Sequence, residues 1–143
     1  MILSQRSLLS ENQAVTATAV STDILDLGLT GTPPLNTLAI TRDLGPGEAI
    51  PILTQVTADF ATLTSLTVTL ETSANDDLST PTVLISSGAI PVADLVAGAH
   101  LLPVRVFPDG ALLRYIGFRY TVTGSNATAG TVTAAIGTMS QTA

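Results

Sequence analysis

The sequence contains one histidine, His100, and no cysteine, which limits the catalytic chemistry open to the chain. A metal-binding jelly roll needs several histidines together with a carboxylate, and one histidine cannot supply that set. A Ser-His-Asp triad is formally possible, but no serine stands in a Gly-x-Ser-x-Gly motif. Without cysteine there are no disulfides, thiolate metal sites or cysteine nucleophiles. We therefore interpret His100 as an ordinary residue of a loop or strand end, and we expect no catalytic residue and no enzymatic activity.

Carboxylates are the next candidates for chemistry. Asp76 and Asp77, within "ANDDLS", could suggest calcium. The segment lacks the alternating ligand spacing and the terminal glutamate of a calcium loop, and we predict a solvated hairpin turn. A pair of carboxylates for glycoside hydrolysis depends on spatial separation, which the sequence does not give. We expect no metal ion and no cofactor.

Two short motifs match functional patterns without their context. "GPGEAI" at 45–50 begins like a dinucleotide loop, but Ile50 stands where the third glycine belongs, and a β pattern follows instead of a helix. "NAT" at 126–128 matches the glycosylation triplet. The N-terminus lacks the apolar stretch of a secretory signal, which argues against glycosylation of this triplet. We interpret both motifs as turns.

A sugar-binding surface would need exposed aromatic rings. The chain has no tryptophan, and Phe118 and Tyr120 share the alternation of apolar residues that face a core. Tyr115 and Phe107 are the rings that we predict to be exposed. A glycan-binding or receptor-binding module is therefore the alternative to the main hypothesis below.

The composition indicates a surface that associates with other proteins. Of the 143 residues, 45% are hydrophobic and only 11% are charged, against about 25% charged in an ordinary soluble domain. The net charge is −6, and an acidic chain with scattered arginines cannot form the cationic stripe that nucleic acids need. Anionic membrane surfaces are disfavoured for the same reason. No stretch is long enough for a membrane span, and we expect synthesis and assembly in a cytoplasm.

An alternation of period two dominates the chain and predicts β-strands. The predicted strands lie in the runs "VTATAV", "AIPILTQVTADF", "LTSLTVTLE", "TVLIS", "HLLPVRVFP", "RYIGFRYTVTG" and "GTVTAAIGT". Turn residues separate them, Pro103 suggests an edge position, and only "PVADLVAGA" suggests one or two helical turns. The pattern predicts an all-β fold: a jelly roll or antiparallel β-sandwich of about eight short strands. We predict a single domain over 14–143, preceded by an extended N-terminal arm over 1–13, with 29–41 as a long loop or hairpin arm.

The candidate contact residues lie in the N-terminal arm and among the arginines. The apolar residues of the arm fall outside the strand pattern and would gain by docking on a neighbour, unless the terminus is simply disordered. Three arginines could contact carboxylates of a partner in bidentate fashion, or could be solvated or locally paired. The full set is Ile2, Leu3, Arg6, Leu8, Leu9, Arg42 and Arg105.

Three segments together carry a resemblance to a known family. They are the Arg42-Asp43-Leu44-Gly45 turn before "PILTQVT", the "SLTVTLETS" strand with its acidic turn, and "RYIGFRYTVTG". From about Asp23 to Ile136 the chain resembles the jelly-roll capsid cement, or decoration, proteins of tailed bacteriophages, of the type found in a Bordetella phage. The 29–41 segment is longer than the usual connection in that family.

The resemblance implies a structural protein of the virion. Such a protein lies on the outside of the icosahedral head, bridges major capsid protein subunits, and has no active site. Binding at capsid symmetry axes implies a homo-oligomer, either a dimer or a trimer, whose weak contacts add through avidity. We expect the major capsid protein and other copies of this chain as partners, and neither nucleic acid nor membrane.

Overall fold

The computed structural model describes residues 5–35, 37–40, 43–44, 50–104 and 106–137. The fold is all-β and antiparallel, which confirms the fold class predicted from the sequence. The strands are β1 Leu8–Ala14, β2 Ala19–Val20, β3 Leu25–Asp26, β4 Asp43–Leu44, β5 Ile52–Ser73, β6 Thr82–Pro91, β7 Gly110–Ala111 and β8 Tyr115–Ile136, and one 3-10 turn, η1, spans Val92–Asp94. In the described ranges no helix is long and apolar enough to cross a membrane.

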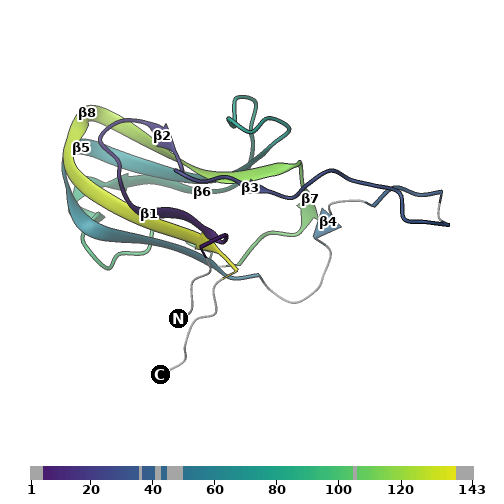
Figure 1. The fold of residues 1–143 in the computed structure, drawn as a ribbon. Coiled ribbons are helices and arrows are strands. Elements are labelled where there is room, and N and C mark those ends of the chain that lie inside the picture. The colour runs from purple at the N-terminus through teal and green to yellow at the C-terminus, as the bar shows by residue number, and fades with distance from the viewer. Residues whose placement is uncertain (1–4, 36, 41–42, 45–49, 105, 138–143) are drawn as a thin grey trace, which may run out of the picture.

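Strands β5 and β8 form the spine of the molecule. Each is 22 residues long, and they pair antiparallel from Ile52↔Ile136 to Ser73↔Tyr115. The main sheet has the order β1-β8-β5-β6, with β2 and β3 also paired to β8. Both long strands curve back at the same place, so the two halves of the sheet face each other as the layers of a sandwich (Figure 1).

Each layer contains one half of each long strand. The first half of β8 pairs with β2 and β3, and the second half of β5 pairs with β6. In the other layer, the second half of β8 pairs with β1, and the first half of β5 meets the 99–107 segment at the Gln55↔His100 and Pro51↔Val106 bridges. The alternating apolar residues of both layers therefore face one another and can exclude water.

An irregular register allows the spine to bend. Between the pairs Ala61↔Ala129 and Leu63↔Gly124, β8 contains four residues where β5 contains only Thr62. The Thr62 hydroxyl donates to the Asn126 carbonyl (2.8 Å) and accepts from the Thr128 amide (3.1 Å). Backbone groups that lose their ladder partner at such a bulge are thus hydrogen-bonded again.

The core lies between the layers and is mainly aliphatic. Its fully buried members include Leu9, Leu66, Val68, Leu70, Ile116, Phe118, Tyr120, Val132 and Ala134. The predicted inward positions of Ile116, Phe118 and Tyr120 are confirmed. Tyr120 shares a buried hydrogen bond of 2.8 Å with the Ser10 hydroxyl, so its polar end is paired.

The structure corrects the predicted strand lengths. One predicted strand ends at Phe60 and the next begins at Leu63, and Gly124–Asn126 was predicted as a turn, but both places lie inside continuous strands as bends. The local residues are the same as those of a turn, whereas the pairing of β5 with β8 resumes on both sides because the partner strand bends as well.

The 100–106 run also differs from the prediction. The alternation predicted Leu102, Val104 and Val106 on one face, but Leu101 and Leu102 are both buried while Val104 and Val106 are 48% and 40% exposed. Pro103 has no amide hydrogen to continue a ladder. The segment therefore holds to β5 by single hydrogen bonds, including Leu101 N to Thr54 O at 3.1 Å.

Candidate interaction surface

The predicted contact residues of the N-terminal arm do not all reach the surface. The arm was predicted over 1–13, but Leu8–Ala14 forms β1 and belongs to the sheet. Leu9 is 1% exposed within the core of its own chain, and Leu8 is half-buried. Leu9 is therefore not available to dock on a neighbour. The sequence pattern did not reveal the strand that places its side chain in the core.

Arg6 is the remaining candidate with an exposed side chain among the residues that the structure describes. It forms no ion pair with any part of the chain that the structure describes. The other predicted contacts, Ile2, Leu3, Arg42 and Arg105, lie outside the described residues.

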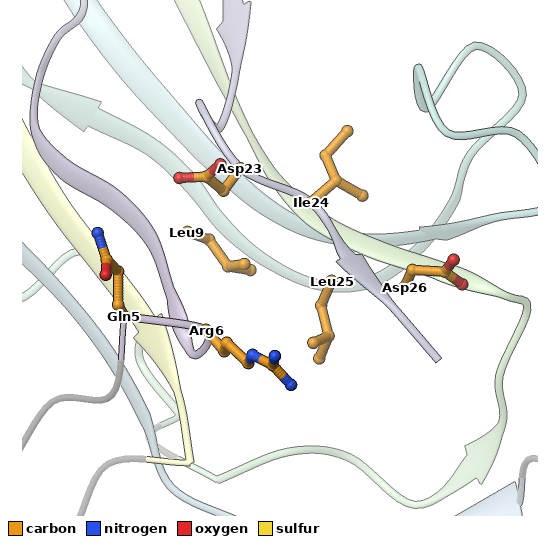
Figure 2. A pocket seen from close by; sticks show the side chains of 7 residues that line it. All are labelled: Gln5, Arg6, Leu9, Asp23, Ile24, Leu25 and Asp26. Carbon is orange, nitrogen blue, oxygen red and sulfur yellow. The ribbon is translucent and has the colours of Figure 1, made fainter. Parts of the chain in front are cut away.

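Arg6 and Leu9 line a groove at one edge of the sandwich, where β1 of one layer lies opposite β3 of the other. The groove has a volume of about 410 Å³ and is lined by Gln5, Arg6, Leu9, Asp23, Ile24, Leu25 and Asp26. Figure 2 shows Leu9 and Leu25 toward its middle, with the Arg6 guanidinium beside Leu25. The carboxylates of Asp23 and Asp26 point away from that middle. The groove thus combines apolar surface on Ile24 and Leu25 with one guanidinium and two carboxylates at its margin, an arrangement that suits binding of a chain segment rather than acid-base chemistry.

A hydrogen-bonded ion pair holds the end of β3 beside this groove. Arg114 donates from Nε and Nη2 to the two carboxylate oxygens of Asp26, both at 2.8 Å, and its guanidinium lies 4.9 Å from the centre of the Tyr115 ring. The hydrogen bonds with Asp26 raise the pKa of Arg114. Both partners are partly exposed, so the pair orients the chain more than it stabilises the fold.

From this point the chain leaves the sandwich as an arm. Residues 27–35 and 37–40, which we call the projecting arm, run out from β3 and return toward β4, far from the layers of the sandwich (Figure 1). Its base is held by Leu27 N to Arg114 O (2.8 Å), and its two sides are joined by Ile40 N to Gly31 O (2.9 Å). The prediction of a long loop or hairpin arm over 29–41 is consistent with this shape.

The projecting arm exposes most of its large apolar side chains. Leu29 is 82% exposed, Leu35 109%, Leu38 73% and Ile40 57%. No charged residue occurs between Asp26 and Arg42. We did not identify these leucines as contact residues from the sequence, although an uncharged stretch with several leucines outside the strand pattern was the available signal.

Other polar groups of the described residues serve the fold. Arg119 Nε donates to Glu71 Oε2 at 2.9 Å, and its Nη2 donates to the Leu78 carbonyl at 2.7 Å. Burial raises the pKa of Tyr120. Every buried side-chain nitrogen and oxygen in the described ranges has a hydrogen-bond partner.

The positions examined for catalysis are dispersed. His100 is exposed, and its backbone forms an isolated antiparallel β-bridge with Gln55. Asp77 accepts a hydrogen bond from Ser79 N at 2.8 Å in a tight turn. Hydrogen bonding by the side chain and then by the amide of Ser79 lowers the pKa of Asp77. Among the residues that the structure describes, no group of three His, Asp or Glu side chains is placed to hold a metal ion. The Gly45 motif lies outside the described residues, apart from Ile50.

The two rings proposed for a sugar site, Phe107 and Tyr115, differ in their exposure to solvent. Phe107, predicted to be exposed, is 6% exposed and packs in the core. The prediction failed because Pro103 interrupts the alternation from which the facing of Phe107 was inferred. Tyr115 is half-buried beneath Arg114.

Comparison with known proteins yields one family. The model of the Bbp16 family matches residues 9–136, which includes all of the main sheet except Leu8, the first residue of β1. No curated protein matches the chain.

Proposed function

The chain belongs to the Bbp16 family, a Bordetella phage protein family, and from this premise we propose that it is a capsid cement protein. In this role it binds the outside of the icosahedral head and bridges neighbouring major capsid protein subunits. It acts as a homo-oligomer, a dimer or a trimer at symmetry axes of the capsid, and carries out no catalysis. It is made in the bacterial host cytoplasm and functions in the virion.

The observation that carries the proposal is apolar surface placed outside the folded sandwich. Four side chains of the projecting arm are more than half exposed, and no charge interrupts them. In a free monomer this apolar surface stays in contact with water, which is unfavourable. Exposed apolar patches of this kind mark sites of association. A protein that functions only within a large assembly covers such a surface in its working state.

The sandwich is suited to transmitting load. Strands β5 and β8 pair with each other on both sides of the bend, from Ile52↔Ile136 to Ser73↔Tyr115, so each of them runs continuously through both layers. Such a body resists separation of its layers when different neighbours pull on its two ends.

Electrostatics favour specific contacts over general attraction. The net charge of −6 opposes binding to any acidic surface, and a lone guanidinium supplies local, bidentate recognition of a carboxylate. We propose Arg6 as one such contact with the capsid, together with Arg42 and Arg105, which the sequence suggests.

The test uses the heads of the phage that encodes this chain. Purified protein is mixed with expanded heads and with precursor shells, and bound protein is measured after sedimentation. We expect binding to expanded heads only, and an increase in the temperature at which DNA-filled heads rupture. Failure to bind expanded heads would contradict the proposal. Bound protein without any change in rupture temperature would argue for display rather than reinforcement.

The alternative of a glycan-binding or receptor-binding module has less support. It relied on Phe107 and Tyr115 as exposed rings, and Phe107 is buried. A glycan-array signal that is lost in Tyr115→Ala would revive it.

A further inference from the structure

We propose that the projecting arm of one chain lies in the groove of a second copy, and that the exchange is reciprocal about a two-fold axis. The two surfaces are the projecting arm, residues 27–35 and 37–40, and the groove between β1 and β3. The proposal goes beyond head binding and does not depend on it, because the dimer should form from purified protein alone.

The chain does not cover its own groove with its own arm. Leu25 and Asp26 line the groove, and the arm begins at the next residue, Leu27. From there the chain leads away from the sandwich (Figure 1). The ion pair of Asp26 with Arg114, at 2.8 Å, fixes this direction of departure. Beyond its base, the arm is therefore placed to reach the groove of a second molecule.

The groove and the arm have matching chemistry. The groove has a volume of about 410 Å³, and its accessible apolar side chains are those of the half-buried Ile24 and Leu25, so a leucine side chain of an entering segment can be buried against them. The arm offers Leu29, Leu35 and Ile40 without any charge that would have to be desolvated.

Charge favours this uncharged segment as a self-contact. Two copies that each carry a net charge of −6 repel one another. The stretch between Asp26 and Arg42 contains no charged residue, so it can approach a second copy with little added repulsion. A strongly charged partner would gain no electrostatic attraction from it.

The area favours reciprocal exchange over a one-sided contact. Burial of the four exposed side chains of one arm removes on the order of 300 Å² of apolar surface from water. A standard interface buries about 800 Å² on each partner, so one arm in one groove is too small. In the reciprocal dimer each chain buries both its arm and its groove, about 600 Å² from these elements alone. A closed two-fold pair also leaves no unpaired arm to extend the assembly.

The first experiment is sedimentation velocity over a range of concentrations. We expect a dimer for the unaltered chain, and an approximately hundredfold weaker dimer for Leu35→Ser. One buried leucine contributes about tenfold in affinity, and the two-fold axis removes two leucines at once. Val83→Ser is the matched control, since Val83 is 52% exposed on β6, outside the arm. It should leave the dimer unchanged.

The second experiment locates the arm by disulfide formation, which the absence of cysteine makes unambiguous. Chains with Leu35→Cys are mixed with chains carrying Gln5→Cys, a residue that lines the groove, and oxidised. We expect a mixed dimer that is cross-linked, and none when Val83→Cys replaces Gln5→Cys. A monomer at high concentration, a trimer, an unaffected dimer in Leu35→Ser, or absence of the mixed cross-link would each overturn the proposal.

Discussion

At the scale of single residues, ion pairs of similar geometry differ in their surroundings. Glu71 is 3% exposed and its partner Arg119 28%, whereas Asp26 and Arg114 are 42% and 33% exposed. Charges in water interact weakly because solvent screens them, while a buried carboxylate without its partner has lost hydration that nothing replaces. The inner pair therefore matters for stability and the outer pair for orientation.

This difference predicts unequal effects of two similar substitutions. Arg119→Met should lower the free energy of unfolding by about 3 kcal/mol, because Glu71 then stays buried without a cation. Arg114→Met, the matched control, should cost less than about 1 kcal/mol. Denaturant unfolding measures both. Equal losses in the two variants would contradict the distinction between the pairs.

A second residue-scale prediction concerns alkaline pH. Burial raises the pKa of Tyr120 above its usual value of 10.0, so above that pH the unfolded chain releases this proton while the folded chain keeps it. Stability from this group is therefore complete below pH 10.0 and falls as the pH rises.

The measurement is the free energy of unfolding at a series of pH values above 9. Tyr120→Phe cannot ionise and keeps the ring in the core, so it should show a shallower decline than the unaltered chain. Identical slopes would mean that Tyr120 already ionises in the folded state.

At the scale of elements, the bend in the spine depends on close approach between β5 and β8. Gly130 has φ of +133°, and a Cβ built on it would overlap Cδ1 of the Phe60 ring. Any larger residue must displace a ring of the core and also adopt a conformation that favours glycine.

Gly130→Ala should therefore lower the free energy of unfolding by about 3 kcal/mol. Gly88→Ala is the matched control, because Gly88 also has a positive φ of +69° but its Cβ would meet nothing within 4 Å. It should cost about 1 kcal/mol from backbone strain alone. Thermal or denaturant unfolding separates the two, and similar losses would show that packing against Phe60 is not limiting.

The 74–81 loop shows how an element can differ from its local sequence. We predicted a solvated hairpin turn, and Asn75, Asp76 and Asp77 are exposed as expected. Leu78, however, is 0% exposed. Its Cδ1 lies so close to Gly117 that a Cβ built on Gly117 would be only 2.7 Å from it. The loop folds back over the outer face of the sheet because Gly117 leaves room and Arg119 binds the Leu78 carbonyl.

At the scale of the whole molecule, folding and association use different parts of the chain. The core lies between the layers, and the projecting arm contributes no residue to it among those described. The free energy of unfolding should therefore depend little on the arm, while assembly depends on it strongly.

Replacement of residues 29–39 by a short Gly-Ser linker tests this separation. The free energy of unfolding of the monomer should change by less than about 1 kcal/mol, since loop closure depends only weakly on length. The dimer should be lost, and the increase in head rupture temperature should shrink because avidity falls. A chain that unfolds after this replacement would show that the arm belongs to the folding unit.

Much of the fold could be predicted because strand alternation is a local property. The inward facing of Ile116, Phe118 and Tyr120 follows from period two alone. Strand lengths could not be predicted in this way, since a bend and a turn use the same residues and differ only in where the chain pairs next. The groove could not be predicted from the sequence either, because Leu9 and Leu25 approach each other only when the two layers pack together.

The sequence by itself determined an antiparallel β fold, an aliphatic core, an acidic chain of low charge, and a resemblance to phage cement proteins. Those properties depend on composition and on neighbours along the chain. Only the tertiary structure decided that Leu9 and Phe107 are buried, that two long strands form one bent spine, and that an apolar arm leaves beside an open groove. Burial and exposure depend on residues distant in sequence, whose contacts the alternation of a single strand does not contain.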